Sequence, residues 1–254
     1  MSNNIRKQLK MNTMNNYFNN QAGFVSPFMV ENAMMLQSYV AKVMRRIYAK
    51  MFLGLIVTAL VSLFVASSPA LIEAIFSSRI VFFGLIIAEL GVVIALSAAI
   101  NKMSSSTATL LFYLYAVLNG VTLSVIFFAY SMHAIALAFS VTAATFGVMS
   151  AYGYLTKADL SKMGAILFMG LIGVIIASLV NLFLASSTLD WVISIAGVVI
   201  FTGLTAWDTQ RFKEMAAMTD PSMSGKVATM GALTLYLDFI NLFLYLLRIF
   251  GRRS

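Results

Sequence analysis

The segment 233-LTLYLDFINLFLYLLRIF-250 is an almost unbroken run of apolar residues that contains one acid, Asp238. At a helical rise of about 1.5 Å per residue, a run of this length approaches the thickness of a bilayer core. A carboxylate at that depth costs roughly 2.5–3.5 kcal/mol on membrane-insertion scales. The segment therefore predicts a membrane helix in which Asp238 needs a partner or a function.

The rest of the chain has the same apolar character. Of its 254 residues, 61% are hydrophobic and 10% are charged, whereas a soluble domain carries about 25% charged residues. The apolar runs reach spanning length and lack the alternation of a lipid-facing β-barrel. The sequence predicts an all-α, polytopic membrane protein with seven transmembrane helices, at approximately residues 48–67, 80–100, 109–130, 134–153, 164–185, 189–207 and 229–250.

Composition excludes several kinds of site. The chain has no cysteine and a single histidine, His133, so disulfides, thiolate chemistry and multi-histidine metal centres are excluded. The net charge is +8, but the basic residues lie at the ends of apolar runs and form no face interleaved with exposed aromatics. Nucleic-acid binding is therefore not expected.

The first 45 residues differ from the rest, being rich in Asn, Gln, Met and basic residues. No apolar segment follows the first basic residues, so a secretory signal peptide is not predicted. We predict a polar, cytoplasmic, partly disordered N-terminal tail over residues 1–45. Within it, residues 1–27 are expected to be mostly disordered and residues 28–46 to form an amphipathic helix on the membrane surface. Residues 46–254 are the predicted seven-helix transmembrane domain.

Basic residues predict the orientation of the chain, because cytoplasmic connections carry an excess of them. With the N-terminus inside, Arg79 is the only basic residue of the outer segments before the C-terminus. Seven full spans would place Arg248 on the outer side, which this rule disfavours. A last run that re-enters and returns to the inner side therefore remains an alternative. The inner segments hold thirteen basic residues: Arg6, Lys7, Lys10, Lys42, Arg45, Arg46, Lys50, Lys102, Lys157, Lys162, Arg211, Lys213 and Lys226.

Three acids, Glu89, Asp208 and Asp238, fall in or at the edge of predicted spans. We expect none of them to have a basic residue close by in the sequence. Each alone could be a tolerated polar residue paired within its helix, but intramembrane acids usually mark a pathway, a relay or a gate. On the last helix, Asp238 belongs to a stripe about 80° wide that should face the bundle interior. The other members of this stripe are Thr234, Asn241, Tyr245 and Arg248.

Asp208 and Asp238 can both lie in the inner half of consecutive antiparallel spans, with Asp238 about 14 Å below the inner surface. Two carboxylates in a medium of low dielectric constant cannot both ionise cheaply, so they should share a proton and titrate as a pair. Their hard oxygen atoms also suit a weakly bound Ca²⁺. The pair therefore predicts a pH-sensing, gating and weak metal-binding site.

Three segments resemble the Bax inhibitor-1 family of small membrane proteins. They are 207-WDTQ-210, 235-LYLDFINLFLYLLRIFG-251 and 89-ELGVVIALSAAINKMS-104, and the resemblance extends over about residues 45–251. It implies six helices around a central seventh and a pH-sensitive Ca²⁺ leak controlled by an aspartate pair at Asp208 and Asp238. Glu89 matches an acidic position of the second helix. Family members often carry an arginine about eleven residues later, where this chain has 98-AAI-100, with Lys102 as the nearest base.

The sequence leaves several functions to be weighed. The first is a pH-sensitive calcium (cation) leak channel without a resident cofactor, with Ca²⁺ and H⁺ as its ions and the lipid bilayer as its surroundings. The alternative is a regulatory protein that restrains other membrane proteins, such as a membrane-bound protease, as bacterial family members do. A proton-coupled transporter is a third candidate, although no inverted repeat is evident. An enzyme is not expected, because Asp238 lacks the Gly-x-Gly-Asp context of intramembrane aspartyl proteases. Short connections favour a bacterial inner membrane.

Overall fold

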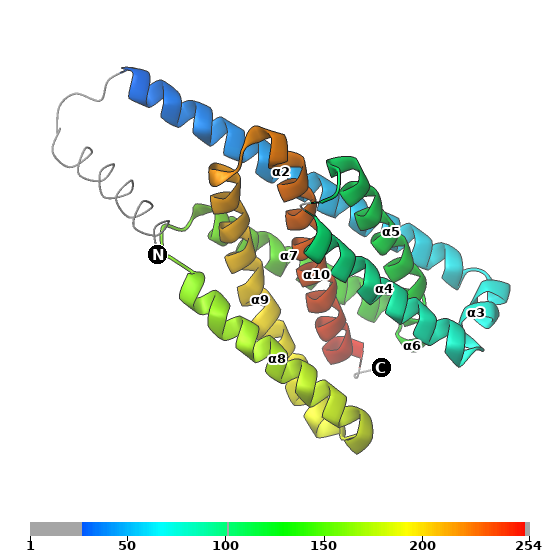
Figure 1. The fold of residues 1–254 in the computed structure, drawn as a ribbon. Helices are drawn as coiled ribbons and strands as arrows, with labels where there is room; N and C mark the ends of the chain where they lie inside the picture. The colour runs from blue at the N-terminus through cyan, green and yellow to red at the C-terminus, as the bar shows by residue number, and fades with distance from the viewer. Residues whose placement is uncertain (1–26, 101, 252–254) are drawn as a thin grey trace. The chain divides into compact units, whose positions relative to one another are not determined.

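A computed structural model describes residues 27–100 and 102–251, and every regular element in these ranges is helical (Figure 1). The prediction of disorder over residues 1–27 lies, except for Pro27, outside the described residues. The helices are α2 (Pro27–Ala66), α3 (Pro69–Phe76), α4 (Arg79–Ala99), α5 (Ser105–Leu123), α6 (Ile126–Ala129), α7 (Met132–Leu155), α8 (Ser161–Leu184), α9 (Ser187–Met218), the 3₁₀ turn η1 (Pro221–Met223) and α10 (Ser224–Phe250).

The predicted fold class is confirmed. Within the described residues, seven helical segments are long and apolar enough to cross a membrane, and each overlaps one predicted run. They are Glu31–Ala66, Arg79–Ala99, Ser105–Ala129, Met132–Leu155, Ser161–Leu184, Ser187–Met218 and Pro221–Phe250. The chain is an all-α polytopic membrane protein.

Serine side chains begin several of these helices. Ser78, Ser104, Ser131 and Ser186 each accept a hydrogen bond from the backbone N–H three residues later. Such N-caps satisfy a donor that the helix itself leaves unpaired, and each typically contributes about 1 kcal/mol. They allow α7 and α9 to start within two or three residues of the preceding helix, which keeps these connections short.

The predicted boundary at residue 46 does not coincide with a break in secondary structure. The segment expected to form a surface helix continues directly into the first span as the 40-residue helix α2. Between the first two spans lies the short helix α3, which the sequence did not predict; Pro69 stands at its start. The last span, α10, is a continuous helix of 27 residues, which favours a full crossing over the re-entrant alternative.

The sixth helix is longer than predicted. We expected it to end near residue 207 and a long connection to follow, but α9 continues to Met218. Contacts of the additional turns explain the extension: Phe212 and Ala216 are buried, and Lys213 Nζ donates to the Tyr154 carbonyl at 2.6 Å. The predicted span ended where charged residues begin. The helix continues beyond that point because the apolar face of these turns is buried against other helices.

Within residues 42–254, α10 is the central helix. It packs against α9, α7 and α5, while α4 packs on α5 and α8 on α9 (Figure 1). In the most apolar part of each helix, 67% of α10 residues are buried, against 6% for α4 and 11% for α8. The apolar residues of α10 therefore face other helices, and α4 and α8 leave most of their surface to lipid.

Aromatic side chains fix α10 in this position. The Tyr236 ring meets Phe112 and Tyr115 of α5 edge-on, with centroids 5.7 and 5.8 Å apart. One turn further on, Phe239 makes similar contacts with Phe139 and Phe146 of α7. Edge-to-face pairs at these separations contribute about 0.5–1.5 kcal/mol beyond the burial of their area. They fix the rotation of α10 and, with it, the position of Asp238.

Candidate functional site

Asp208 of α9 and Asp238 of α10 are both buried, with 4% of each residue exposed. Asp208 lies ten residues before the end of α9, and Asp238 fourteen residues after the start of α10. The two helices are antiparallel neighbours, so both distances are counted from the connection between them. Along the helix axes, Asp208 and Asp238 lie about 15 and 21 Å from the ends that this connection joins. The two carboxylates therefore lie at comparable heights on adjacent helices, both in the interior of the bundle.

Neither carboxylate is fully hydrogen-bonded. Oδ1 of Asp208 and Oδ2 of Asp238 are buried without a hydrogen-bond partner among the described residues. Native proteins rarely leave such oxygens unpaired, and the exceptions require an explanation such as strain, a bound ion or a functional role. Two negative charges at this site would also repel each other through a medium of low dielectric constant.

The expectation that no base lies near these acids is wrong for Asp208. Arg211, one turn later on the same helix, places Nη1 3.6 Å from Asp208 Oδ1. This distance makes an ion pair but not a hydrogen bond, and the arginine side chain is 49% exposed. Its guanidinium also lies over the Trp207 ring, 5.3 Å from the centroid. The cation that pairs with Asp208 in the described residues thus comes from α9 itself, not from Lys102.

The two residues after Asp208 attach α9 to its neighbours. The Thr209 hydroxyl lies 3.4 Å from the Tyr48 hydroxyl and donates to Ser150 at 3.5 Å. Gln210 accepts from the backbone N–H of Leu160 at 2.9 Å and donates to the Ala158 carbonyl at 2.7 Å. The segment 208-DTQ-210 therefore places an acid in the core and connects the α7–α8 turn to α9.

Glu89 is not brought into contact with the aspartate pair. Its carboxylate accepts from Thr122 Oγ1, and from Asn119 Nδ2 at 3.5 Å. Asn119 in turn accepts from the Tyr236 hydroxyl at 3.0 Å, and this hydroxyl lies 2.6 Å from Thr58 Oγ1. The network links α4, α5, α10 and α2, so Glu89 is partnered by α5 and is connected to α10 through Asn119.

Comparison with known proteins agrees with this architecture. The family described as "Inhibitor of apoptosis-promoting Bax1" matches residues 40–254. The chain belongs to the Bax inhibitor-1 family. It is 52% identical to the inner membrane protein YbhL of Escherichia coli K12 over 221 residues, which cover 86% of this chain and 93% of YbhL. It is 49% identical to an uncharacterized protein of Borreliella burgdorferi, covering 84% and 92%, and 44% identical to the uncharacterized protein RP147 of Rickettsia prowazekii, covering 83% and 89%.

In this Bax inhibitor-1 family member, the predicted polar stripe of the last helix does not face the interior as a whole. Asp238 is buried, but Thr234, Asn241, Tyr245 and Arg248 are only partly buried. Asn241 donates back to the Leu237 carbonyl at 2.8 Å, and the Tyr245 ring stacks on Phe201 at 5.9 Å. The apolar faces of α10 contact the other helices at the centre of the bundle. Most of the polar stripe therefore lies on the less buried side of α10.

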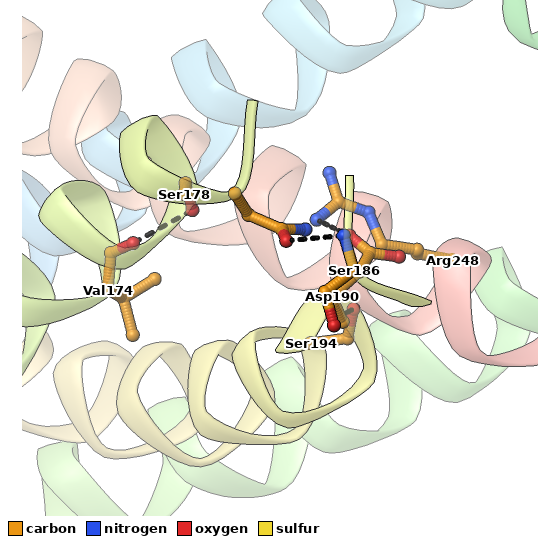
Figure 2. A network of polar contacts seen from close by, with 7 residues as sticks. Val174, Ser178, Ser186, Asp190, Ser194 and Arg248 are labelled. Carbon is orange, nitrogen blue, oxygen red and sulfur yellow. Dashed lines mark hydrogen bonds and ion pairs between the residues drawn. The ribbon is translucent and has the colours of Figure 1, made fainter. Parts of the chain in front are cut away.

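The far end of this stripe meets an acid that sequence analysis did not single out. Figure 2 shows Arg248 of α10 reaching Asp190 in the first turn of α9, with Nη1 3.1 Å from Oδ1. A sequence signal existed, since Asp190 stands at the start of one apolar run and Arg248 at the end of the next, antiparallel one. The ion pair partly neutralises the arginine.

A metal would find few protein ligands at the aspartate pair. Among the described residues, no group of three or more His, Cys, Asp or Glu side chains could hold a metal ion. Asp208 and Asp238 could provide carboxylate oxygens, and water or backbone carbonyls would have to complete the shell of a Ca²⁺ ion, which takes about 6–8 oxygens. Such a site suits transient binding.

Proposed function

We propose that this Bax inhibitor-1 family member is a pH-sensitive calcium (cation) leak channel gated by Asp208 and Asp238. The observation that carries the proposal is the pair itself: two buried carboxylates on adjacent helices, each with an oxygen that has no hydrogen-bond partner in the described residues. Intramembrane acids of this kind are costly and are usually retained for a pathway or a gate. The proposal involves no catalysis and no resident cofactor.

Charge on the pair provides a gating mechanism. When ionised, the pair attracts the Arg211 guanidinium, 3.6 Å from Asp208, and retains a cation that enters the site. A proton on the pair weakens both attractions, and conduction requires that an ion be able to leave its binding site. We therefore expect cation flux to rise as pH falls. Thr234, Asn241 and Tyr245, on the less buried side of α10, are candidates for lining the route, and Glu89 for supporting it through Asn119.

The membrane is proposed from the relatives and the charge pattern. YbhL is named as an inner membrane protein of a bacterium, and the excess of basic residues favours a cytoplasmic N-terminus. We assign this chain to a bacterial inner membrane in that orientation.

Calcium flux into proteoliposomes, measured across a range of pH, tests the gating proposal. The double variant Asp208→Asn/Asp238→Asn should lose the pH dependence, because an amide cannot bind or release the proton. Asp159→Asn is the matched control: this acid lies in the exposed α7–α8 connection, and hydrogen bonds from Ser161 hold its pKa below the ordinary value. A calcium flux that still depends on pH in the double variant would contradict the gating proposal.

A second candidate function is the restraint of another membrane protein, such as a membrane-bound protease. It is favoured by the first turns of α2, where residues 31–38 are exposed and include Met34, Met35 and Leu36. An exposed helix with apolar side chains suits recognition by a partner. Deletion of residues 1–40 separates the two functions, since partner control would be lost while the pH-dependent flux of the bundle would persist.

A further inference from the structure

A second polar region lies away from the aspartate pair, at the end of the bundle where α8 ends, α9 begins and α10 ends. A pocket of about 370 Å³ opens between these helices. Its polar lining consists of Ser178, Asn181, Asp190, Tyr245 and Arg248. Figure 2 shows Ser178, Asp190 and Arg248 around this region. Its described lining combines one positive and one negative side chain.

The two charges remain accessible. The side chains of Arg248 and Asp190 are 39% and 26% exposed, and an ion pair in contact with solvent is held weakly enough to be exchanged. Arg248 also lies over the Tyr245 ring at 5.6 Å, which holds its guanidinium plane in place. Within the described residues, this guanidinium donates one hydrogen bond, to Asp190, although arginine has five N–H donors. It can therefore bind a further anion.

The other wall of the pocket is apolar and faces lipid. It includes Ile175, Leu179 and Leu182 of α8, which are 50%, 55% and 76% exposed. Next to Asp190, Trp191 is 50% exposed, and tryptophan is enriched where a membrane meets water. A molecule in this pocket would thus touch both charged groups and the hydrocarbon region.

We propose that this pocket binds the headgroup of a zwitterionic phospholipid that carries a primary ammonium group. Arg248 binds the phosphate, Asp190 accepts hydrogen bonds from the ammonium, and the acyl chains lie along the exposed face of α8. Among the described lining residues, Arg248 and Asp190 complement the phosphate and the ammonium of the headgroup in sign. A free phosphate would match only Arg248 and would leave the apolar wall unused.

Lipid titration followed by native mass spectrometry of the full chain tests the proposal. The probes are phosphatidylethanolamine, phosphatidylcholine and phosphatidylglycerol with identical acyl chains. Phosphatidylethanolamine should bind with a Kd about tenfold lower than the other two, a difference expected from charged hydrogen bonds. Asp190→Asn should remove the preference over phosphatidylcholine, whose methylated ammonium cannot donate hydrogen bonds. Arg248→Gln should weaken binding of all three lipids.

Controls keep the outcome interpretable. Arg79→Gln removes an exposed arginine at the start of α4 and should change nothing. Arg248→Lys keeps a cation and should retain part of the affinity, which guards against a folding defect in Arg248→Gln. Equal Kd values for the three lipids in the wild type would overturn the proposal, as would a preference over phosphatidylcholine that survives Asp190→Asn or Kd values that Arg248→Gln leaves unchanged. Displacement of the lipid by an equal concentration of inorganic phosphate would identify a simple anion site instead.

Discussion

At the scale of single residues, the approach of α7 to α9 depends on Gly153. A methyl group at this position would overlap the carbonyl group of Ala206, which is backbone and cannot move aside. Small residues are the usual means by which membrane helices come this close. Ala206 stands two residues before Asp208, so this contact also fixes where the buried acid lies.

Gly153→Ala should therefore lower the thermal unfolding midpoint of the purified protein. Overpacking of this kind costs about 1–3 kcal/mol, more than the roughly 1 kcal/mol that alanine gains over glycine in a helix. A methyl group at Gly147, on the same helix, would meet no atom within 4 Å outside its chain neighbours and the nearby backbone of its own helix. Gly147→Ala is therefore the control and should be neutral or stabilising. Equal midpoints for the two variants would contradict the packing argument.

Individual residues also show what the sequence could reveal. Asp208 and Asp238 were found from hydrophobicity alone, because an acid inside an apolar run is conspicuous. Arg211 could have been found too, since residues three apart share a helix face. The partners of Tyr236 could not, because its hydrogen bonds to Asn119 and Thr58 join positions more than a hundred residues apart and depend on helix rotation.

At the scale of elements, α9 acts as a clamp on the turn between α7 and α8. Gln210 holds the Leu160 N–H and the Ala158 carbonyl, and Lys213 holds the Tyr154 carbonyl. Apolar runs located all seven membrane helices, but they placed the end of α9 eleven residues too early. Hydropathy identifies residues that can face lipid. The last turns of α9 are stabilised instead by polar contacts with the α7–α8 turn, which hydropathy does not detect.

Replacement of Gln210 by alanine should loosen this turn. The Leu160 amide loses its acceptor, and loss of a buried hydrogen bond typically costs about 1 kcal/mol, so local exchange should accelerate roughly fivefold to tenfold. Hydrogen exchange followed by mass spectrometry over residues 156–160 measures the effect. Gln37→Ala, at an exposed position of α2, serves as control, and unchanged exchange in Gln210→Ala would contradict the clamp.

At the scale of the whole molecule, the distribution of charge predicts the orientation in the membrane. Seven spans with a cytoplasmic N-terminus place Arg248 on the outer side, which the positive-inside rule disfavours. Its ion pair with Asp190 at 3.1 Å reduces that cost, and the continuous helix α10 agrees with a full crossing. The orientation stays a prediction from the basic residues, and the structure adds an ion pair that would compensate its one exception.

Because the chain has no cysteine, single cysteines can report this orientation directly. Ser77→Cys lies in the predicted outer connection after α3, and Asp159→Cys in the predicted inner connection after α7; both positions are exposed. A membrane-impermeant maleimide should label Ser77→Cys in intact spheroplasts and Asp159→Cys only after lysis. The reverse pattern would show that the N-terminus is outside.

The central place of α10 also has a consequence for biosynthesis. The helix around which α5, α7 and α9 pack follows all three in the sequence, so it leaves the ribosome after them. Until then, the faces of α5, α7 and α9 that pack on α10 lack their partner. We therefore expect the nascent chain to remain an open, loosely associated set of helices, and assembly to finish only when the segment that carries Asp238 enters the membrane.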